Sequence, residues 1–272
     1  MAAAPAPIRL SGWALVLGAS SGFGAASALA LASAGLDVFG VHLDRRAALA
    51  GVEAIVAGIE ALGQRAHFFN VNAADADKRA EVTATMLRRL AEAGQPGALR
   101  VLLHSLAFGT LRPYVADDPK DAVTPAQVGM TLEVMAHSLV YWTQDVVGRG
   151  LMGPGGRIFA MTSTGSTHAL PSYGAVSAAK AALEAHVRQL AVELAPRRIT
   201  VNAIRAGLTA TPAAQKIPGY QALEDGARRR NPSGRLTTPE DVARALVALS
   251  HDDTAWITGN VIGVDGGEDI VG

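Results

Sequence analysis

The stretch LGASSGFGAASALAL, residues 17–31, joins an apolar run to an alanine-rich helical pattern through three glycines. Residues 13–18 predict a buried strand, and the pattern over 22–34 predicts a helix. The glycines have the spacing G-x-x-x-G-x-G, which is typical of a turn whose backbone approaches a phosphate group at a helix start. We therefore predict a dinucleotide-binding turn. Its predicted contact residues are Gly18, Ser20, Ser21, Gly22, Phe23 and Gly24.

Short apolar runs and helical patterns alternate along the rest of the chain. The predicted strands are 13–18, 37–42, 66–70, 101–104, 157–162, 200–204 and 261–264, and the predicted helices are 22–34, 46–62, 75–93, 127–149, 173–195 and 239–250. This alternation is typical of a parallel sheet that is covered on both faces. We predict an α/β fold with one doubly wound Rossmann domain of about seven parallel strands.

The domain boundaries follow from composition. Residues 1–10 contain two prolines and predict a loose leader, so the single folded domain would span residues 11–272. The segment near 206–236 is punctuated by glycine and proline, and we expect a mobile flap over the carboxyl edge of the sheet. Ligands of such sheets bind at that edge.

Charge and composition exclude several classes of function. The 272 residues include 24 Lys and Arg, 24 Asp and Glu and no Cys, so the formal net charge is zero and disulfides and thiolate metal sites are excluded. Without a basic excess we expect no nucleic-acid or membrane partner. The seven histidines lack paired metal-ligand spacing, so we expect no metal. We also expect a cytoplasmic protein. His104 and His186 are interpreted as satisfied core or boundary groups.

The end of the second predicted strand bears on the choice of nucleotide. In the sequence VFGVHLDRR, residues 38–46, His42 occupies the position where an acid would bind the ribose of NAD, and Asp44 lies two residues later. Arg45 and Arg46 favour the 2′-phosphate of NADP, although a solvated helix start would explain them as well. We predict NADPH, with NADH as the alternative. The candidates for contact with adenine are Asn70 and Val71.

A further stretch, TSTGSTHALPSYGAVSAAK at 162–180, places Tyr173 seven residues before Lys180. The chain also carries HSLAF at 104–108, VNAIRAG at 201–207 and VDGG at 264–267. With the glycine turn, these motifs resemble the short-chain dehydrogenase/reductase superfamily across essentially the whole chain. The seven-residue spacing and HSLAF resemble more narrowly the bacterial enoyl-acyl-carrier-protein reductases, because other members usually have Tyr and Lys four residues apart.

The spacing suits the chemistry that this resemblance implies. Seven residues are almost two helical turns, so Tyr173 and Lys180 share one helix face about 10 Å apart. In enoyl thioester reduction the hydride goes to the β-carbon while charge develops on the more distant thioester oxygen. Tyr173 would stabilise that enolate, and Lys180 would hold the nicotinamide ribose. Taken alone, the pair would also suit an amphipathic tyrosine and a lysine that reaches out of the core.

Ser163 lies seventeen residues before Lys180, where the wider superfamily keeps its catalytic serine. The best-known enoyl reductases have a second tyrosine there. An NADPH-using enoyl reductase subfamily resembles this chain more closely, because it combines the serine with the seven-residue spacing and an LRP element, here residues 111–113. The superfamily's helix asparagine aligns with Met135, which we interpret as a core residue.

The resemblance also implies the remaining contacts. Further predicted cofactor contacts are Ser105, Leu106, Ala107, Lys180, Ala206, Gly207, Thr209 and Thr211, and the predicted substrate contacts are Phe108, Gly109, Tyr173 and Leu208. Strand-end packing would equally explain Leu106, and a helix cap would explain either threonine. Apolar flap residues would line an acyl tunnel or close the core; they are Leu208, Ile217 and Leu223.

We therefore expect an NAD(P)H-dependent enoyl thioester reductase. A carbonyl or 3-ketoacyl reductase is the first alternative, and a non-catalytic NADPH sensor is the second. The basic residues at 228–230, with Arg235, suit an acidic acyl carrier protein, although a solvated helix face is the simpler interpretation. Relatives are commonly homotetramers, so a homotetramer is expected.

Overall fold

The computed structural model describes residues 8–271, and its centre is a seven-stranded parallel sheet. The strand order is β3-β2-β1-β4-β5-β6-β7. The strands are β1 (Trp13–Leu17), β2 (Asp37–His42), β3 (Ala66–Asn70), β4 (Leu99–His104), β5 (Arg157–Thr162), β6 (Thr200–Ala206) and β7 (Val261–Val264). The predicted doubly wound α/β fold is confirmed. The order reverses between β1 and β4, and this is where such sheets bind ligands.

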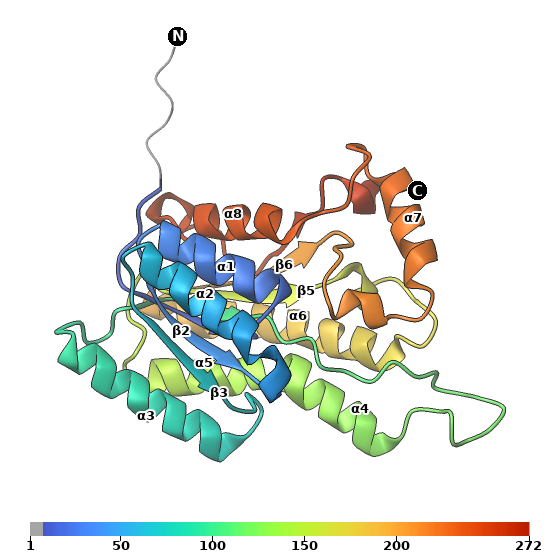
Figure 1. Ribbon diagram of the computed structural model, residues 1–272, viewed down its shortest axis with the longest axis horizontal. Coiled ribbons are helices and arrows are strands. Elements are labelled where there is room, and N and C mark those ends of the chain that lie inside the picture. Colours follow the sequence, from blue (N-terminus) through green and yellow to red (C-terminus); the bar gives the residue numbers. More distant parts are fainter. Residues whose placement is uncertain (1–7, 272) are drawn as a thin grey trace, which may run out of the picture.

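Helices cover both faces of this sheet. They are α1 (Gly22–Ser33), α2 (Leu49–Ala61), α3 (Ala76–Glu92), α4 (Pro125–Leu132), α5 (Ser138–Gly148), α6 (Gly174–Leu194), α7 (Tyr220–Arg230) and α8 (Pro239–Leu249). Figure 1 shows α1, α2 and α8 on one side of the sheet and α3, α4, α5 and α6 on the other. Each layer has its own apolar core, and the central strands are buried on both sides. No helix among the described residues is long and apolar enough to cross a membrane.

Two predicted elements differ from the structure. The single helix predicted over 127–149 is divided into α4 and α5 by a π-helical turn, η2 (Glu133–His137), which accommodates an extra residue in the helix. The flap near 206–236 contains a helix, α7, that the sequence did not predict. Its only buried residue is Ala227, so α7 lacks the apolar stripe by which helices are recognised in sequences.

The predicted leader can be assessed only in part. Residues 1–7 lie outside the described residues, but the backbone N–H of Leu10 donates to Ala34 O at 2.8 Å, and Leu10 packs against the core beneath α1. Leu10 therefore belongs to the packed domain rather than to a loose leader.

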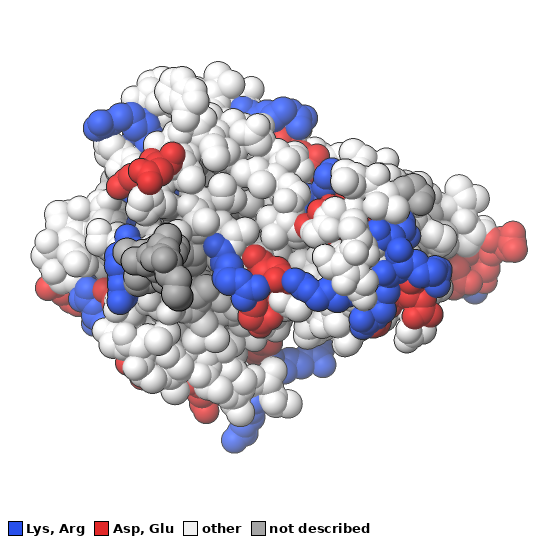
Figure 2. Space-filling model, turned by 90° about the horizontal axis from the view of Figure 1, so that it is seen from above, with Lys and Arg blue, Asp and Glu red and all other residues white. Residues whose placement is uncertain are grey.

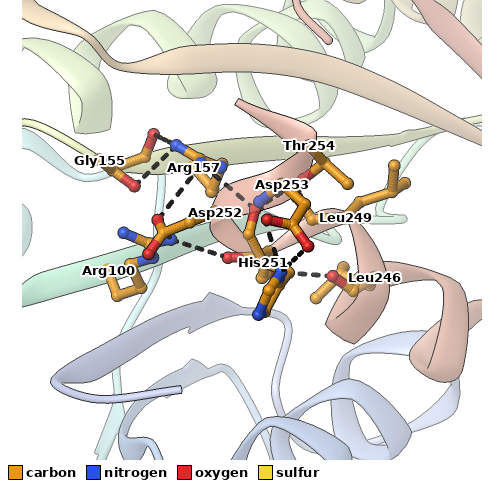
Figure 3. Close-up of polar contacts among 11 residues, drawn as sticks. Arg100, Gly155, Arg157, Leu246, Leu249, His251, Asp252, Asp253 and Thr254 are labelled. Atoms are coloured by element: carbon orange, nitrogen blue, oxygen red, sulfur yellow. Dashed lines mark hydrogen bonds and ion pairs between the residues drawn. The ribbon is translucent and has the colours of Figure 1, made fainter. Parts of the chain in front are cut away.

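The amino ends of the strands are held by a polar cluster, which Figure 3 shows. Arg157 is buried and donates to Gly155 O at 2.8 Å and to His251 O at 3.3 Å. Arg100 bonds Asp252 at 2.5 Å. These contacts tie the segment after α8 to β4 and β5 at the sheet edge opposite the glycine turn. The candidate active site is therefore expected at the opposite edge of the sheet, where the strands have their carboxyl ends.

Candidate active site

The glycine turn lies at the carboxyl end of β1. Gly18 has φ +87°, and a Cβ built there would lie 2.2 Å from Ser105 O. A Cβ at Gly24 would lie 2.0 Å from Gly18 O. Both positions therefore require glycine, because the backbone of the turn packs directly against backbone.

The start of α1 is open to an anion. Ser21 is the N-cap residue, but its side chain makes no capping hydrogen bond. The first-turn N–H groups of this twelve-residue helix are left without a side-chain acceptor, and the helix dipole favours negative charge there. The turn thus fits the pyrophosphate of a dinucleotide.

A second polar cluster joins the ends of β2 and β3. His42 Nδ1 lies 2.9 Å from Asp44 Oδ2, and Asn70 exchanges two 3.0 Å hydrogen bonds with the backbone of Asp44. The carboxylate of Asp44 is therefore engaged by a buried histidine. Within residues 8–271, neither Arg45 nor Arg46 makes a side-chain hydrogen bond or an ion pair, and both are exposed. The side chains of Arg45 and Arg46 are therefore available to a ligand, whereas the carboxylate of Asp44 already has a partner.

A cavity of about 440 Å³ opens at the carboxyl edge of the sheet. It brings together predicted residues from α1, α6, the end of β6 and the loops after β4, β5 and β6; these are Phe23, Ser105, Leu106, Ala107, Phe108, Gly109, Ser163, Tyr173, Lys180, Ala206, Gly207, Leu208, Thr209 and Thr211. The other predicted cofactor residues do not line it; these are Gly18, Ser20, Ser21, Gly22, Gly24, His42, Arg45, Arg46, Asn70 and Val71. They belong to the phosphate turn and the two strand ends described above. The volume is within the usual range for a small-molecule site.

Tyr173 immediately precedes α6, and Lys180 lies in the second turn of that helix. Ser172, just before the tyrosine, has φ +59°, a left-handed conformation that non-glycine residues rarely adopt. Such strain is common at functional sites. Burial raises the pKa of Tyr173, and the nearby hydroxyl of Ser163 opposes that rise. Tyr173 is therefore a neutral hydrogen-bond donor at ordinary pH.

Gly165 allows the tyrosine and the serine to approach each other. A Cβ at this position would lie 2.6 Å from Tyr173 Cε1 and 3.2 Å from Ser163 Oγ. Ser163 Oγ is buried and makes no hydrogen bond of good geometry among the described residues, although it lies near enough to Tyr173 to influence the pKa of that side chain. An unpartnered buried hydroxyl beside a tyrosine is suited to a ligand oxygen. The sequence did not single out Gly165.

Lys180 is almost fully buried, and its Nζ donates to Met161 O at 2.6 Å. Burial lowers the pKa of Lys180 to about 8, whereas the carboxylate of Glu184 acts to raise it. The amine therefore carries a positive charge through most of the neutral range.

His104 lies beneath this site and is not fully satisfied, contrary to our interpretation. Its Nε2 lies 2.8 Å from Ser138 Oγ, but its Nδ1 has no partner among the described residues. Burial lowers the pKa of His104 to about 3, so it stays neutral. His186 is paired with His137 at 3.0 Å, as expected of a boundary group.

Met135 lies on the π-helical turn and lines the cavity. It is 3% exposed, and its Sδ would lie 2.8 Å from a Cβ at Gly109. The interpretation of Met135 as a core residue is right about burial but incomplete, because the side chain also forms part of the cavity wall. A thioether cannot replace the amide of asparagine as a polar group.

The flap closes over the glycine turn. A Cβ at Gly22 would lie 3.2 Å from Thr211 Cγ2, and Thr211 Oγ1 accepts a 3.2 Å hydrogen bond from Ala214 N. Thr211 thus binds the first residue of the short helix η5 (Ala214–Lys216), whose N-cap residue is Ala213, while its hydroxyl proton stays available to a ligand. Thr209 is buried and donates to Gly207 O at 3.0 Å.

The chain end also contributes to the cavity, which sequence reasoning missed. Glu268 is 7% exposed, and it accepts a 3.1 Å hydrogen bond from Leu208 N. Burial raises its pKa. The apolar residues of the cavity include Leu208, Ile217 and Leu223. The sequence alone allows these three flap residues either to line an acyl tunnel or to close the core. No motif in the sequence marks Glu268.

Most of the predicted basic cluster is neutralised. Arg228 pairs with Glu224 at 2.8 Å, Arg230 with Glu268 at 3.6 Å and Arg235 with Asp241 at 2.6 Å. Figure 2 shows Lys and Arg side chains close to acidic ones on this side of the molecule. Arg229 forms no ion pair within the described residues and is the remaining candidate for docking.

Another cavity, of about 410 Å³, lies beside Trp13 and Arg65. None of the predicted site residues lines it, and the Arg65 charge is already paired with Asp37. The catalytic candidates lie in the cavity at the carboxyl edge. Among residues 8–271, no three His, Cys, Asp or Glu side chains gather as a metal site.

The features that define a short-chain dehydrogenase/reductase are a seven-stranded parallel sheet, a dinucleotide turn, and a partly buried tyrosine at the start of a helix that carries a buried lysine. A family model described as enoyl-(acyl carrier protein) reductase matches residues 18–268. The chain therefore belongs to the enoyl-acyl-carrier-protein-reductase-like family of short-chain dehydrogenases/reductases, and it is an oxidoreductase.

Individual relatives include enzymes of two activities. An NADH-dependent enoyl-acyl-carrier-protein reductase of Aquifex aeolicus is 32% identical over 65% of this chain, and the match spans 64% of that protein's length. A 3-oxoacyl-acyl-carrier-protein reductase of Thermotoga maritima is 28% identical over 93% of this chain and 96% of its own length. Sequence similarity thus establishes the family, and the substrate has to be inferred from the residues of the site.

Solved structures agree on the fold. The structure of the Aquifex aeolicus enoyl reductase has a TM-score of 0.82 at 24% identity and covers 98% of this chain and 99% of its own. A Burkholderia cenocepacia short-chain dehydrogenase in complex with NADP has a TM-score of 0.78 at 31% identity, covering 96% of this chain and 99% of its own.

Proposed function

We propose that this protein uses NADPH to reduce the 2,3 double bond of a trans-2-enoyl thioester. The observation that carries the proposal is the placement of Tyr173 seven residues before Lys180, with both side chains in one cavity. Seven residues place the two Cα atoms about 10 Å apart along the helix axis. This separation suits a reaction in which hydride and developing charge lie on different atoms of the substrate.

The roles of the side chains follow from their positions. When bound, NADPH would supply the hydride for the β-carbon, and protonation of the resulting enolate at the α-carbon, by Tyr173 or by water, would complete the reduction. Tyr173 donates a hydrogen bond to the thioester oxygen as it becomes an enolate, in a cavity whose low polarity strengthens the bond. Lys180 holds the nicotinamide ribose and keeps the local potential positive. Ser163, with its unpartnered hydroxyl, is a second donor toward the same oxygen.

The apolar wall supports an acyl substrate. Phe108 is 66% exposed at the cavity mouth, and Met135, Leu208 and Ile217 extend the apolar lining. Gly109 lets the loop after β4 approach Met135 and Val176 closely. Such a lining favours an alkyl chain by burial of apolar area.

Carbonyl reduction is the second candidate. Ser163 beside Tyr173 favours it, because this is the serine position of the carbonyl-reducing relatives. Met135 opposes it, because the asparagine of their proton relay is absent.

For the cofactor we propose NADPH rather than NADH, because Asp44 is engaged by His42 and the two arginines beyond it are free within the described chain. We further propose that the substrate thioester is linked to an acyl carrier protein, which docks near Arg229. We also propose that the protein is cytoplasmic.

We also propose a homotetramer. Strand β7 is the last strand of the sheet and pairs only with β6. Trp256, just before it, is 97% exposed, and Val192 on α6 is 72% exposed. Light scattering after size exclusion tests this assembly, and a monomer would contradict it.

The test of the reaction compares four mixtures of purified protein. NADPH or NADH is combined with a 2-enoyl-CoA or a 3-ketoacyl-CoA, and the loss of reduced-nicotinamide absorbance is followed. We expect oxidation of NADPH with the enoyl substrate. Oxidation with the ketone alone would establish the carbonyl reductase instead. A carrier-linked enoyl substrate extends the test if both CoA esters are inert.

A further inference from the structure

Two side chains of α6 hold the same end of β5. Lys180 Nζ donates to Met161 O at 2.6 Å, and Thr162 Oγ1 donates to Glu184 Oε1 at 2.6 Å. Lys180 and Glu184 are four residues apart and therefore lie on one face of the helix. Met161 and Thr162 are the last two residues of β5, directly before Ser163. The lysine, the glutamate and the serine are thus linked through two adjacent residues.

The charge of Lys180 needs support because the side chain is 6% exposed. Burying an ammonium group is unfavourable unless an opposite charge or several acceptors compensate. Its bonded partner, Met161 O, is a neutral carbonyl. Burial is the main cause that lowers the pKa of Lys180 to about 8, and Glu184 is the group that opposes it.

The other elements packed around Lys180 do not supply this negative charge. Strand β4 contributes His104, which is neutral, β5 contributes the hydroxyl of Thr162, and the residue after β5 contributes the hydroxyl of Ser163. Helix α4 carries no ionisable residue. Of the two ionisable residues of η2, His137 is paired with His186, and Glu133 is not among the groups that shift the pKa of Lys180. The remaining charged groups have other partners. Glu268, which lines the same cavity as Lys180, is paired with Arg230 and does not shift the pKa of Lys180. Asp145 of α5 is paired with Arg79, and Arg205 of β6 is paired with Asp269.

We propose that Glu184 is a positioning residue, which keeps Lys180 cationic and fixes both the lysine and the Ser163 strand end for cofactor binding. The inference rests on the proposed binding of NADPH beside Lys180, and it does not depend on which acyl substrate is reduced. Glu184 is itself outside the cavity lining, so it acts through Lys180 and Thr162.

The test measures NADPH affinity by nucleotide fluorescence between pH 6.5 and 9.5, without any acyl substrate. The wild type is expected to lose affinity with a midpoint near pH 8, where Lys180 deprotonates. In Glu184→Gln the midpoint should fall by about 1 pH unit, because an adjacent opposite charge shifts a pKa by this order. Binding would then be about fivefold weaker than wild type at pH 8, with near-equal affinity at pH 6.5.

Three further variants make the result specific. Glu193→Gln removes an equal charge from an exposed site on the same helix and should keep the wild-type curve. Glu184→Asp keeps the charge and should restore most of the midpoint. Lys180→Met should weaken binding and abolish the pH dependence.

Several outcomes would overturn the inference. These are an unchanged midpoint in Glu184→Gln, a uniform loss of affinity at every pH, or a pH dependence that survives in Lys180→Met. Failure of the wild type to bind NADPH would overturn it together with the cofactor proposal. Failure to reduce enoyl thioesters would leave the binding curves, and therefore this inference, intact.

Discussion

The two halves of the cleft are built in different ways. On the β1 side, backbone packs on backbone, so Gly18 and Gly24 have no room for a side chain. On the β5–β6 side, the cavity is shaped by the side chains of Tyr173, Met135 and Ser163 and by the flap. The comparison indicates that the half proposed to bind the cofactor is fixed by backbone geometry, whereas the half proposed to bind the substrate is shaped by side chains.

The largest expected effect on turnover is that of Tyr173→Phe. Removing one preorganised donor to a developing oxyanion lowers kcat by roughly 10²–10³-fold. Binding of NADPH should stay within about twofold, because α6 and Lys180 remain in place. Steady-state rates and fluorescence titration measure the two effects separately. Tyr141→Phe on α5 is the matched control and should keep wild-type activity.

Gly18→Ala should reduce the affinity for NADPH by a comparable factor. The new Cβ would meet Ser105 O at 2.2 Å in a left-handed conformation, so the turn must move. Loss of about 3 kcal/mol of cofactor binding corresponds to about 100-fold in Kd. Gly51→Ala, in α2, meets nothing within 4 Å and should leave binding unchanged with an equal or higher Tm. Normal NADPH binding by Gly18→Ala would refute the backbone account.

A smaller effect is expected at the end of β2. Replacing Arg45 and Arg46 together by Ala should weaken NADPH binding about 10-fold, while NADH binding changes less than about twofold. Isothermal titration with both nucleotides measures this ratio. An equal loss for both would show that the arginines do not discriminate the 2′-phosphate.

The smallest effect is expected at α7. Arg229→Glu should raise KM about threefold for a carrier-linked substrate and leave KM for the CoA ester unchanged, because an unpaired surface charge contributes to partner attraction. Equal effects on both substrates would remove the docking proposal.

The sequence predicts the cofactor half better than the substrate half. Glycine spacing, apolar strand runs and the Tyr173–Lys180 pair are local patterns, so the sheet and the turn follow from them directly. Glu268 and Gly165 reach the cavity only through tertiary packing, and nothing near them in the sequence marks this. Helix α7 carries almost no apolar face, and η2 differs from an α-helix by a backbone irregularity without a residue signature.

The most direct measurement follows a deuterium atom from reduced nicotinamide to product. Protein, NADPH deuterated at the transferred position and a 2-enoyl-CoA are combined, and mass spectrometry and NMR locate the label. The account predicts a saturated acyl-CoA with one deuterium on the β-carbon, formed by the wild type and almost absent with Tyr173→Phe. Transfer to 3-ketoacyl-CoA alone, giving a deuterated 3-hydroxyacyl-CoA, would contradict the enoyl reductase assignment.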